Sequence, residues 1–506
     1  FPKHPFAWKV LGAVLTVTGR TSEAADAKQT AVSLSPQDAE AHSNLGNTLR
    51  EMGRLDEALA SCRQAIALKP DFAAAHSNLG LTFHELGRLD EALASHNQAI
   101  ALKPDYAKGH SNLGVTFHEL GRLDEALGSY NQAIALKPDY AKAHSNLGVT
   151  FQELGRLHEA IASYTQAITL KPDYAEALVN LGIAIKNVKF NSPNPKLYPP
   201  LTQLITAGNF CRPKDVAGSI LRLLEQDTQI KDLPLKKNFT LRLNEATSIL
   251  ESLDKLPLLH NLMRLSPLPA LQFEDLFVML RSFLLKNLDK MEASPKLIYF
   301  LSTLSLHCFT NEYVYIESDE ETHLIDELQA NISQLMAQSE QPAALKVLCL
   351  ASYRSLHQYD WCQKLESLDN LKEVKKRLIA DPLLEKVIAQ EIPMLEEISD
   401  AMSLKVRQQY EENPYPRWVK LSVFPEAKPI AAVCDGFKLQ LYSDNIKNVT
   451  APAILIAGCG TGQHSIETAS RFSNCHVNAV DLSLASLAYA QRKSNELRFT
   501  NIDYLQ

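Results

Sequence analysis

Three glycines near the carboxyl end of the chain have the spacing of a nucleotide-binding loop. Ile454 to Ala457 is a short apolar run typical of a buried strand, and Gly458-Cys459-Gly460-Thr461-Gly462-Gln463 follows it directly. A helical pattern then continues to Phe472. Glycines let the backbone pass close to a ligand, and the free amides at the start of a helix bind polar groups. The spacing therefore predicts a strand, a ligand-binding loop and a helix.

A second strand and an acidic residue follow at the distance that nucleotide binding requires. His476 to Val480 is predicted to form this strand, and Asp481 stands directly after it, 21 positions beyond Gly460. A carboxylate at this place can accept hydrogen bonds from both hydroxyls of a ribose. The pattern predicts a further helix over Ser483 to Asn495 and a third strand over Asn501 to Tyr504. We therefore expect the last residues to begin a doubly wound α/β domain.

Two kinds of cofactor are compatible with this pattern. The dinucleotide fingerprint needs a glycine at the sixth position of the loop, where this chain has Gln463. The pattern that remains, Gly458, Gly460 and Gly462 with Asp481, resembles the first two motifs of class I S-adenosylmethionine-dependent methyltransferases. A dinucleotide enzyme and a non-catalytic relic remain alternatives. The resemblance implies S-adenosylmethionine as the cofactor, bound by Gly458, Cys459, Gly460, Thr461, Gly462 and Asp481.

One position departs from that family. Many members have an acidic residue just before the loop, which contacts the methionine amino group, whereas this chain has Ile456. The partner of that amino group is therefore unassigned. The sequence also identifies no catalytic base, no methyl acceptor and no acceptor atom.

The segment upstream of the loop is rich in aromatic residues and proline. Gln409-Tyr410-Glu411-Glu412-Asn413-Pro414-Tyr415-Pro416-Arg417-Trp418 resembles the segment that precedes the methyltransferase domain in bacterial proteins with helical repeats. In one interpretation, Tyr410, Tyr415 and Trp418 cover a sulfonium cation or a substrate, and Arg417 holds a carboxylate. In the other, the segment is a rigid hinge that packs on the catalytic domain. The sequence leaves both interpretations open.

The first third of the chain repeats every 34 residues. Ala41-His42-Ser43-Asn44-Leu45-Gly46 recurs almost unchanged from residues 75, 109 and 143. This period resembles the tetratricopeptide (TPR) repeat, a pair of helices that stacks into a superhelical solenoid. In the third unit we expect Gly87 to end the first helix through a left-handed cap, Asp90 to cap the second helix and Pro104 to stop it. The resemblance predicts five repeats plus one helix over residues 5–189.

Two polar residues recur with the same period. The histidines at 42, 76, 110 and 144 are interpreted as structural, because neighbouring helix axes lie about 8 to 10 Å apart and equivalent side chains cannot readily share a zinc ion. The asparagines resemble a ladder that holds an extended peptide in related arrays, since a carboxamide both donates and accepts hydrogen bonds. In the alternative interpretation they only bond neighbouring helices. The predicted peptide-binding residues are Asn44, Asn78, Asn112, Asn146 and Asn180.

The chain between the repeats and the loop offers few chemical groups of interest. A proline-rich stretch at 191–200 breaks the helical pattern, and apolar residues return at helical spacing from 201 to about 402. The expected fold is mainly α, with the start of an α/β Rossmann-like methyltransferase domain at the end. The expected domains are a TPR superhelix at 5–189, an all-helical middle domain at 201–402, a linker or cap at 403–450 and an incomplete methyltransferase domain at 451–506.

The composition excludes several classes of partner. Of the 506 residues, 45% are hydrophobic and 22% are charged, and the formal net charge is −7. An acidic balance without a long basic run favours neither nucleic acid nor an anionic membrane surface. The eight cysteines form no C-x-x-C pair, so we expect no metal site and no disulfide scaffold, and a cytoplasmic location.

Taken together, these features resemble bacterial proteins that join TPR repeats to a class I methyltransferase. The expected function is S-adenosylmethionine-dependent methylation of a protein, or of a partner held by the repeats. A TPR interaction scaffold without catalysis is the alternative, and glycosyl transfer is disfavoured because no second nucleotide-binding half follows. Because the chain starts at Phe1 and stops at its third predicted strand, we interpret it as a fragment truncated at both ends and expect no methyl transfer from these residues alone.

Overall fold

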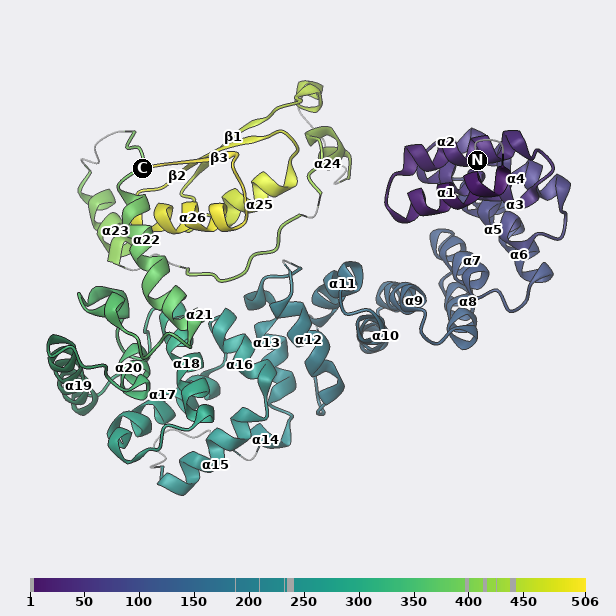
Figure 1. Cartoon of the computed structure of the whole chain (residues 1–506). Coiled ribbons are helices and arrows are strands. Elements are labelled where there is room, and N and C mark those ends of the chain that lie inside the picture. Colours follow the sequence, from purple (N-terminus) through teal and green to yellow (C-terminus); the bar gives the residue numbers. More distant parts are fainter. Residues whose placement is uncertain are drawn as a thin grey trace. The chain divides into compact units, whose positions relative to one another are not determined.

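The computed structural model forms two compact units, Phe1–Ile185 and Lys186–Gln506, which are considered separately below (Figure 1). It describes residues 4–186, 188–208, 210–231, 233, 241–395, 400–412, 416–424, 426–436 and 443–506. Within these ranges no helix is both long and apolar enough to cross a membrane.

The first unit is a stack of five antiparallel helix pairs followed by one more helix, as the 34-residue period predicts (Figure 1). Each helix packs on its partner within the pair, and the second helix of each pair packs on the first helix of the next. The helices are α1 (Pro5–Val17), α2 (Thr21–Leu34), α3 (Ala39–Glu51), α4 (Leu55–Leu68), α5 (Ala73–Glu85), α6 (Leu89–Leu102), α7 (Ala107–Glu119), α8 (Leu123–Leu136), α9 (Ala141–Glu153), α10 (Leu157–Leu170) and α11 (Ala175–Ile185).

Glycine reverses the chain inside each pair. Gly87 follows α5 with a φ of 72°, and its counterparts Gly19, Gly53, Gly121 and Gly155 share this left-handed conformation, which confirms the predicted cap. The predicted capping role of Asp90 is wrong. Arg88 is the N-cap of α6 and contributes no side-chain cap, and Asp90 lies in the first turn of that helix. In this turn its carboxylate interacts favourably with the positive end of the helix dipole, but Asp90 is not the capping residue.

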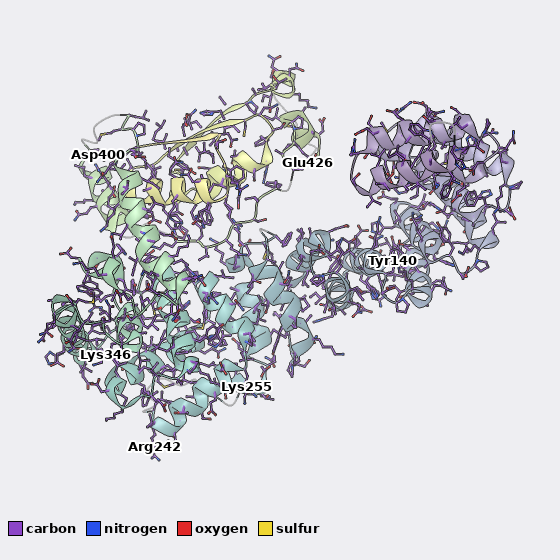
Figure 2. All side chains as sticks on the ribbon, in the orientation of Figure 1. Tyr140, Arg242, Lys255, Lys346, Asp400 and Glu426 are labelled. Atoms are coloured by element: carbon purple, nitrogen blue, oxygen red, sulfur yellow. The ribbon has the colours of Figure 1, made fainter. Side chains whose placement is uncertain are left out.

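An aromatic residue precedes the first helix of most repeats. Tyr140, which Figure 2 labels at the start of α9, is one of these residues. Its ring lies 5.4 Å from the Lys137 ammonium, and the equivalent lysine and ring pair recurs before α5, α7 and α11. A cation over an aromatic face is worth about 0.5 to 1 kcal/mol at an exposed site. The connection between repeats is therefore built from the same contact each time.

A second set of glycines brings the two helices of each pair together. A Cβ added to Gly114 would lie 2.6 Å from the Tyr130 ring, and the same contact recurs in every pair. We call the side chains that fill this space the glycine-facing residues. They are Lys28, Cys62, His96, Tyr130 and Tyr164, opposite Gly12, Gly46, Gly80, Gly114 and Gly148.

The second unit begins with helices that pack around an apolar core. Short 3₁₀ and π turns connect several of them, and the described residues between 201 and 390 are almost entirely helical or in turns, as predicted. The helices are α12 (Tyr198–Thr206), α13 (Pro213–Leu224), α14 (Thr228–Lys231), α15 (Leu243–Asp254), α16 (Pro257–Leu265), α17 (Leu271–Lys286), α18 (Pro295–Thr310), α19 (Asp319–Ala337), α20 (Ala344–Ala351), α21 (Lys372–Lys375), α22 (Asp381–Ala389), α23 (Ala401–Glu412) and α24 (Ile430–Gly436).

The unit ends with a parallel sheet in the order β1-β2-β3, joined by two helices. These elements are β1 (Ala453–Ala457), α25 (Gln463–Arg471), β2 (His476–Val480), α26 (Leu484–Glu496) and β3 (Ile502–Leu505). Leu455 pairs with Asn478, and Asn478 pairs with Asp503. Both crossovers run in the same direction along the sheet, so right-handed connections place α25 and α26 on one face (Figure 1). This is the arrangement with which a Rossmann-like domain begins.

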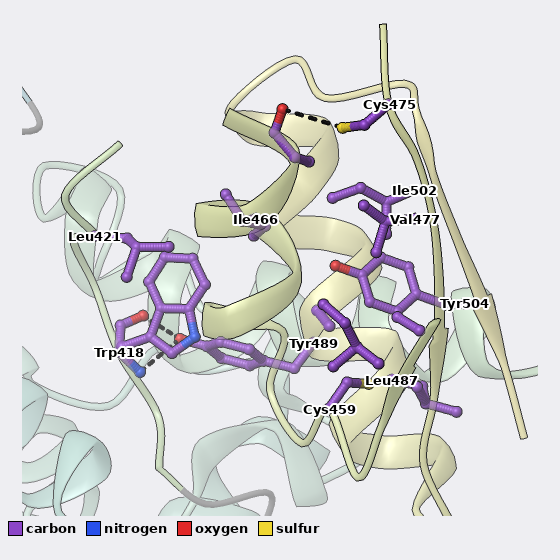
Figure 3. Packing of buried hydrophobic residues seen from close by; sticks show 14 residues of the cluster. Trp418, Leu421, Cys459, Ile466, Cys475, Val477, Leu487, Tyr489, Ile502 and Tyr504 are labelled. Carbon is purple, nitrogen blue, oxygen red and sulfur yellow. Dashed lines mark hydrogen bonds between the residues drawn. The ribbon is translucent and has the colours of Figure 1, made fainter. Parts of the chain in front are cut away.

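The covered face of the sheet forms one apolar core with residues from outside the α/β segment. Figure 3 shows Val477, Ile502 and Tyr504 of the sheet packed against Ile466 of α25 and Leu487 of α26. Trp418 and Leu421, which precede the sheet by more than 30 residues, are buried in the same cluster. On the other face Leu455 is 69% exposed. The segment before the loop is therefore an integral part of this core.

The glycine contacts in the array predict opposite effects for two similar substitutions. Gly114→Ala forces a methyl group against the Tyr130 ring, so we expect it to lower the free energy of unfolding by about 1 to 3 kcal/mol. Gly128 lies within α8, and a Cβ there meets no atom within 4 Å. Gly128→Ala should therefore raise the stability by about 0.5 to 1 kcal/mol. Urea denaturation of the full chain measures both, and equal effects would contradict the close approach.

Candidate functional site

A cleft of about 730 Å³ lies at the carboxyl ends of β1 and β2. This is the edge of a parallel sheet at which doubly wound folds bind their ligands. The sheet, its loops and its helices contribute Ala457, Gly458, Cys459, Gly460, Thr461, Gln463, His464, Val480, Asp481, Leu482, Ser483 and Ser486. The preceding segment contributes Arg407, Tyr410 and Pro416.

The three loop glycines all have positive φ, but they serve two purposes. Side chains at Gly458 and Gly460 would meet no atom within 4 Å, so these glycines face open space. A Cβ at Gly462 would instead lie 2.6 Å from the Ala490 Cβ and 2.9 Å from the Tyr504 hydroxyl. Gly462 therefore permits close packing of the loop on α26 and β3. The first two glycines leave room for a ligand.

Asp481 holds the loop in shape. Its carboxylate accepts a hydrogen bond of 2.8 Å from the Gly460 amide and one of 3.0 Å from the Ser483 amide. A carboxylate oxygen can accept more than one hydrogen bond, so both oxygens keep capacity for hydroxyl groups of a ligand. The predicted ribose-binding residue thus also fixes the backbone of the predicted ligand-binding loop.

The start of α25 supplies amides without a side-chain cap. Gly462 is the N-cap residue, and the first helical residues, Gln463 and His464, line the cleft. Such a helix start favours a negatively charged or polar group of a ligand. Cys459 also lines the cleft, but burial raises the pKa of its thiol to about 12, so it is a neutral thiol at physiological pH.

The end of α23 closes one side of the cleft. The Glu411 carboxylate accepts hydrogen bonds from the Leu484 amide at 2.7 Å and the Ala485 amide at 3.1 Å, and so caps α26. The Ser483 hydroxyl donates to the carbonyl of Tyr410, a residue that lines the cleft and is 39% exposed. Sequence reasoning assigned no role to Glu411, because a cap supplied by a distant segment leaves no spacing signal.

Trp418 is buried and binds the backbone of the glycine loop. Its indole donates to the Thr461 carbonyl at 2.9 Å, and the Thr461 hydroxyl donates to the Pro416 carbonyl at 2.8 Å. The Trp418 backbone and the Tyr489 hydroxyl are hydrogen-bonded to each other, as dashed lines in Figure 3 show. Trp418 as a whole is 6% exposed. These contacts make Trp418 part of the support of the glycine loop rather than of the cleft wall.

Arg417 links the loop support to the helical part of the unit. Its guanidinium lies 2.6 Å from a Glu312 oxygen and 3.7 Å from a Glu385 oxygen, and it lies 4.5 Å from the Phe309 ring centroid. Both carboxylate partners are about 10% exposed. The contacts of Arg417 and Trp418 therefore favour the rigid-hinge interpretation, whereas Tyr410 faces the cleft. Tyr415 lies outside the described residues.

The predicted asparagine ladder is partly engaged between helices. The side-chain amides of Asn78 and Asn112 donate to the hydroxyls of Ser43 and Ser77 in the preceding repeat, at 3.1 and 3.0 Å. Asn112 is buried, Asn146 and Asn180 are half-buried and Asn44 is exposed. The Asn78 amide also donates to the Ser43 carbonyl at 3.4 Å, so its oxygen is the group left for other partners. The Asn112 bond leaves a second N–H and the carboxamide oxygen. The geometry thus allows both interpretations of the ladder.

The recurring histidines fasten the connections between repeats. His76 Nε2 lies 2.9 Å from the carbonyl oxygen of Pro70, and the histidines at 42, 110 and 144 make the same bond at 3.0 Å. Because a carbonyl oxygen accepts, Nε2 must carry the proton. This periodic bond explains the recurrence of histidine without a metal ion.

The buried contact between Arg417 and Glu312 predicts a pH dependence. Burial raises the pKa of Glu312 from an ordinary value of 4.5 to about 7. Between these values the folded chain retains a proton that the unfolded chain has released, so the free energy of unfolding falls as pH rises. Glu312→Gln should make this fall smaller between pH 5 and 8 in urea denaturation.

Glu317→Gln is the matched control for this measurement. The hydrogen bond from Arg354 lowers the pKa of Glu317, so its titration lies below this pH range in the folded chain. The Glu317 variant should keep the pH dependence of the unchanged chain. An equal slope in the Glu312 variant would contradict the assigned titration.

The comparisons with protein families match two parts of the chain. Tetratricopeptide repeat families match residues 29–60, 46–87, 80–121, 116–155 and 141–174. The methyltransferase domain family matches residues 454–506. The comparison with curated proteins found no match.

Several solved structures resemble part of the chain. TTC0263, a thermophilic TPR protein of Thermus thermophilus, is 28% identical, with a TM-score of 0.34, and the match covers 36% of this chain and 99% of that one. PilW, a type IV pilus biogenesis factor, is 21% identical, with a TM-score of 0.35, covering 40% and 93%. YrrB, a TPR protein with an unusual peptide-binding site, is 22% identical, with a TM-score of 0.28, covering 35% and 91%. The chain therefore joins an array of tetratricopeptide repeats to a segment of the methyltransferase domain family.

Proposed function

We propose that this chain is the partner-binding and cofactor-binding part of an S-adenosylmethionine-dependent methyltransferase. The observation that carries the proposal is the cleft at the carboxyl ends of β1 and β2, where Gly458 and Gly460 face open space beside the Asp481 carboxylate. The family match over 454–506 agrees with this assignment. The TPR array would capture a protein that is the methyl acceptor or carries it.

The residues of the cleft suit the parts of S-adenosylmethionine. Asp481 would accept hydrogen bonds from the ribose hydroxyls, and the uncapped start of α25 would face the methionine carboxylate. The exposed Tyr410 ring would cover the bound molecule from the side of α23. Ile456 is buried below the loop, so the methionine amino group must find its partner elsewhere.

Methyl transfer requires the protein mainly to align the acceptor with the methyl group. When bound, S-adenosylmethionine would supply a methyl group on a sulfonium sulfur. The acceptor would attack the methyl carbon in line with its bond to sulfur, and that bond would break to leave a neutral thioether. The loop and its support hold the cofactor, and the surrounding residues exclude water. A general base is needed only if the acceptor must lose a proton. We assign no residue to that role.

Cofactor binding is tested by substitutions at Gly460 and Asp481. Gly460→Val places a branched side chain in the open space of the cleft, and Asp481→Ala removes the carboxylate that binds the Gly460 amide and would bind the ribose. Gly460→Val should abolish binding of S-adenosylmethionine by filling this space, and Asp481→Ala should weaken binding about 5- to 150-fold, since an unsatisfied polar partner costs about 1 to 3 kcal/mol. Isothermal titration calorimetry measures the binding.

The same titration with NAD separates the two cofactors. Binding of NAD but not of S-adenosylmethionine would contradict the proposal, and binding of neither would favour a scaffold without catalysis. Asp481→Asn keeps the size of the side chain and one acceptor oxygen, but its NH2 group faces one of the two backbone amides that Asp481 binds, so it should also weaken binding. Thermal denaturation of each variant shows whether the loss of binding reflects loss of the fold.

The array is proposed to bind an extended peptide through its asparagines. Carboxamides that recur every 34 residues offer hydrogen bonds to a peptide backbone without selecting its side chains. Asn78 and Asn112 would bind the peptide with the hydrogen-bonding groups that their bonds to the preceding helix do not use. The exposed Asn44 lies at one end of the row.

Alanine substitutions test the ladder against its structural alternative. Asn112→Ala with Asn146→Ala should weaken peptide binding and leave the helical circular dichroism signal nearly unchanged. Ser77→Ala is the matched control, because it removes the partner of Asn112 between helices but no asparagine. If the double variant loses thermal stability while peptide affinity stays the same, the asparagines serve only to join the helices.

A further inference from the structure

A second cavity, of about 320 Å³, adjoins the candidate cofactor cleft. Pro416 and Gln463 line both spaces, so the cavity and the cleft share part of their walls. The start of α13 and residues 265–269, which follow α16, also line the cavity. Its volume is well above the roughly 30 Å³ that one water molecule occupies in the liquid, so it can hold a side chain. A group bound in this cavity would lie next to the bound cofactor.

Gln463 is the polar residue at the boundary between the two spaces. It occupies the position at which a dinucleotide-binding loop has glycine, and it is the first residue of α25. The residue is half-buried. Within the described part of the chain, no hydrogen bond engages its carboxamide. Its N–H groups can therefore donate to a ligand that reaches from the cavity towards the cleft.

The acidic residue at this cavity is neutralised. Among the described residues that line it, Asp215 supplies the one carboxylate. An Asp215 oxygen lies 3.1 Å from the Arg212 guanidinium and 3.2 Å from the Lys186 ammonium. Arg212 also lies 3.3 Å from a Glu467 oxygen, and Arg417 is paired with the two carboxylates described above. These groups leave no net negative charge in the cavity.

Two lysines at the cavity keep an uncompensated charge. The Lys420 ammonium donates to the carbonyls of Thr206 and Gly208, and Lys214 is exposed. Neither has a carboxylate within ion-pair distance across the residues that the structure describes. Burial lowers the pKa of Lys420, and a bound carboxylate would offset part of that effect. The cavity is therefore positively charged and favours an anion.

A carboxylate suits this cavity better than an amine does. A lysine or arginine side chain would bring a further positive charge, and an ammonium must lose a proton to a base before it can attack. The described lining contains no histidine, and Asp215 is salt-bridged. A carboxylate is deprotonated at physiological pH, so it can act as a nucleophile without a base.

We propose that this cavity holds the methyl acceptor and that the acceptor is a carboxylate. Lys214 and Lys420 attract it, and Gln463 donates to it at the boundary with the cleft. One carboxylate oxygen would form a bond to the methyl carbon while the carbon–sulfur bond breaks and its electron pair stays on sulfur. The products are a methyl ester and a neutral thioether, with no proton transferred. The inference rests on the proposed function and adds its substrate class.

Analogues of S-adenosylhomocysteine test this inference by binding alone. In these analogues a nitrogen replaces the sulfur and carries an arm of two to four methylene groups, which ends in a carboxylate, a carboxamide or an ammonium. In isothermal titration calorimetry with the full chain, the carboxylate arm of the best length should bind about tenfold more tightly than the carboxamide arm. The ammonium arm should bind most weakly. Equal affinities for the three ends at every length would overturn the inference.

Lysine variants assign the preference to this cavity. Lys214→Met with Lys420→Met should reduce the tenfold preference to less than about twofold. Lys214→Met alone removes an exposed side chain, so it should keep the thermal stability and still lose part of the preference. Lys255→Met is the matched control, because Lys255, labelled in Figure 2, is exposed and does not line the cavity. A preference that persists in the two lysine variants would contradict the assignment.

The remaining arms of the experiment separate the sources of the carboxylate and the two levels of proposal. Plain arms imitate an aspartate or glutamate side chain, whereas arms with an acylated nitrogen next to the carboxylate imitate the end of a chain. The tighter of the two identifies the source. Binding of S-adenosylhomocysteine without any preference among the arms would overturn this inference alone. Failure of S-adenosylhomocysteine and of every analogue to bind would overturn the proposed function together with it.

Discussion

The absence of a Cβ at a few glycines is the constraint on which both units depend. In the array, each glycine of a first helix makes room for one side chain of the second helix, so the helices approach closely at the same place in every repeat. In the second unit, Gly462 lets the loop contact Ala490 and Tyr504. Gly458 and Gly460 differ, because the space beside them stays open. The same residue type thus builds the core in one place and leaves room for a ligand in another.

The support of the glycine loop comes from far along the chain. Pro416 and Trp418 hold Thr461 from both sides, and Arg417 joins this segment to Glu312 and Glu385 of the helical part. The loop is thereby tied to the end of α18 and to α22 through buried polar contacts, which are costly to break once one partner is removed. The helical part between the array and the sheet therefore does more than separate them. Its acidic residues help to fix the geometry of the candidate cofactor site.

Asp481 is half-buried and combines a structural contact with a place in the cleft. Its carboxylate accepts hydrogen bonds from the Gly460 and Ser483 amides of the backbone, yet both oxygens keep capacity for a ligand. The same side chain therefore shapes the loop and remains a candidate for ligand binding.

The sequence by itself determined the repeats, the left-handed glycines and the order of strands and helices around the loop. These features depend on local rules: a 34-residue period, positive φ at glycine and alternation of apolar runs with helical spacing. The predicted strand over His476 to Val480 and the cap at Gly87 agree with the structure for this reason. The tertiary structure decided the partners of individual side chains. The contacts of Glu411 with the start of α26 and of Trp418 with the glycine loop join segments distant in sequence, and no spacing along the chain encodes them.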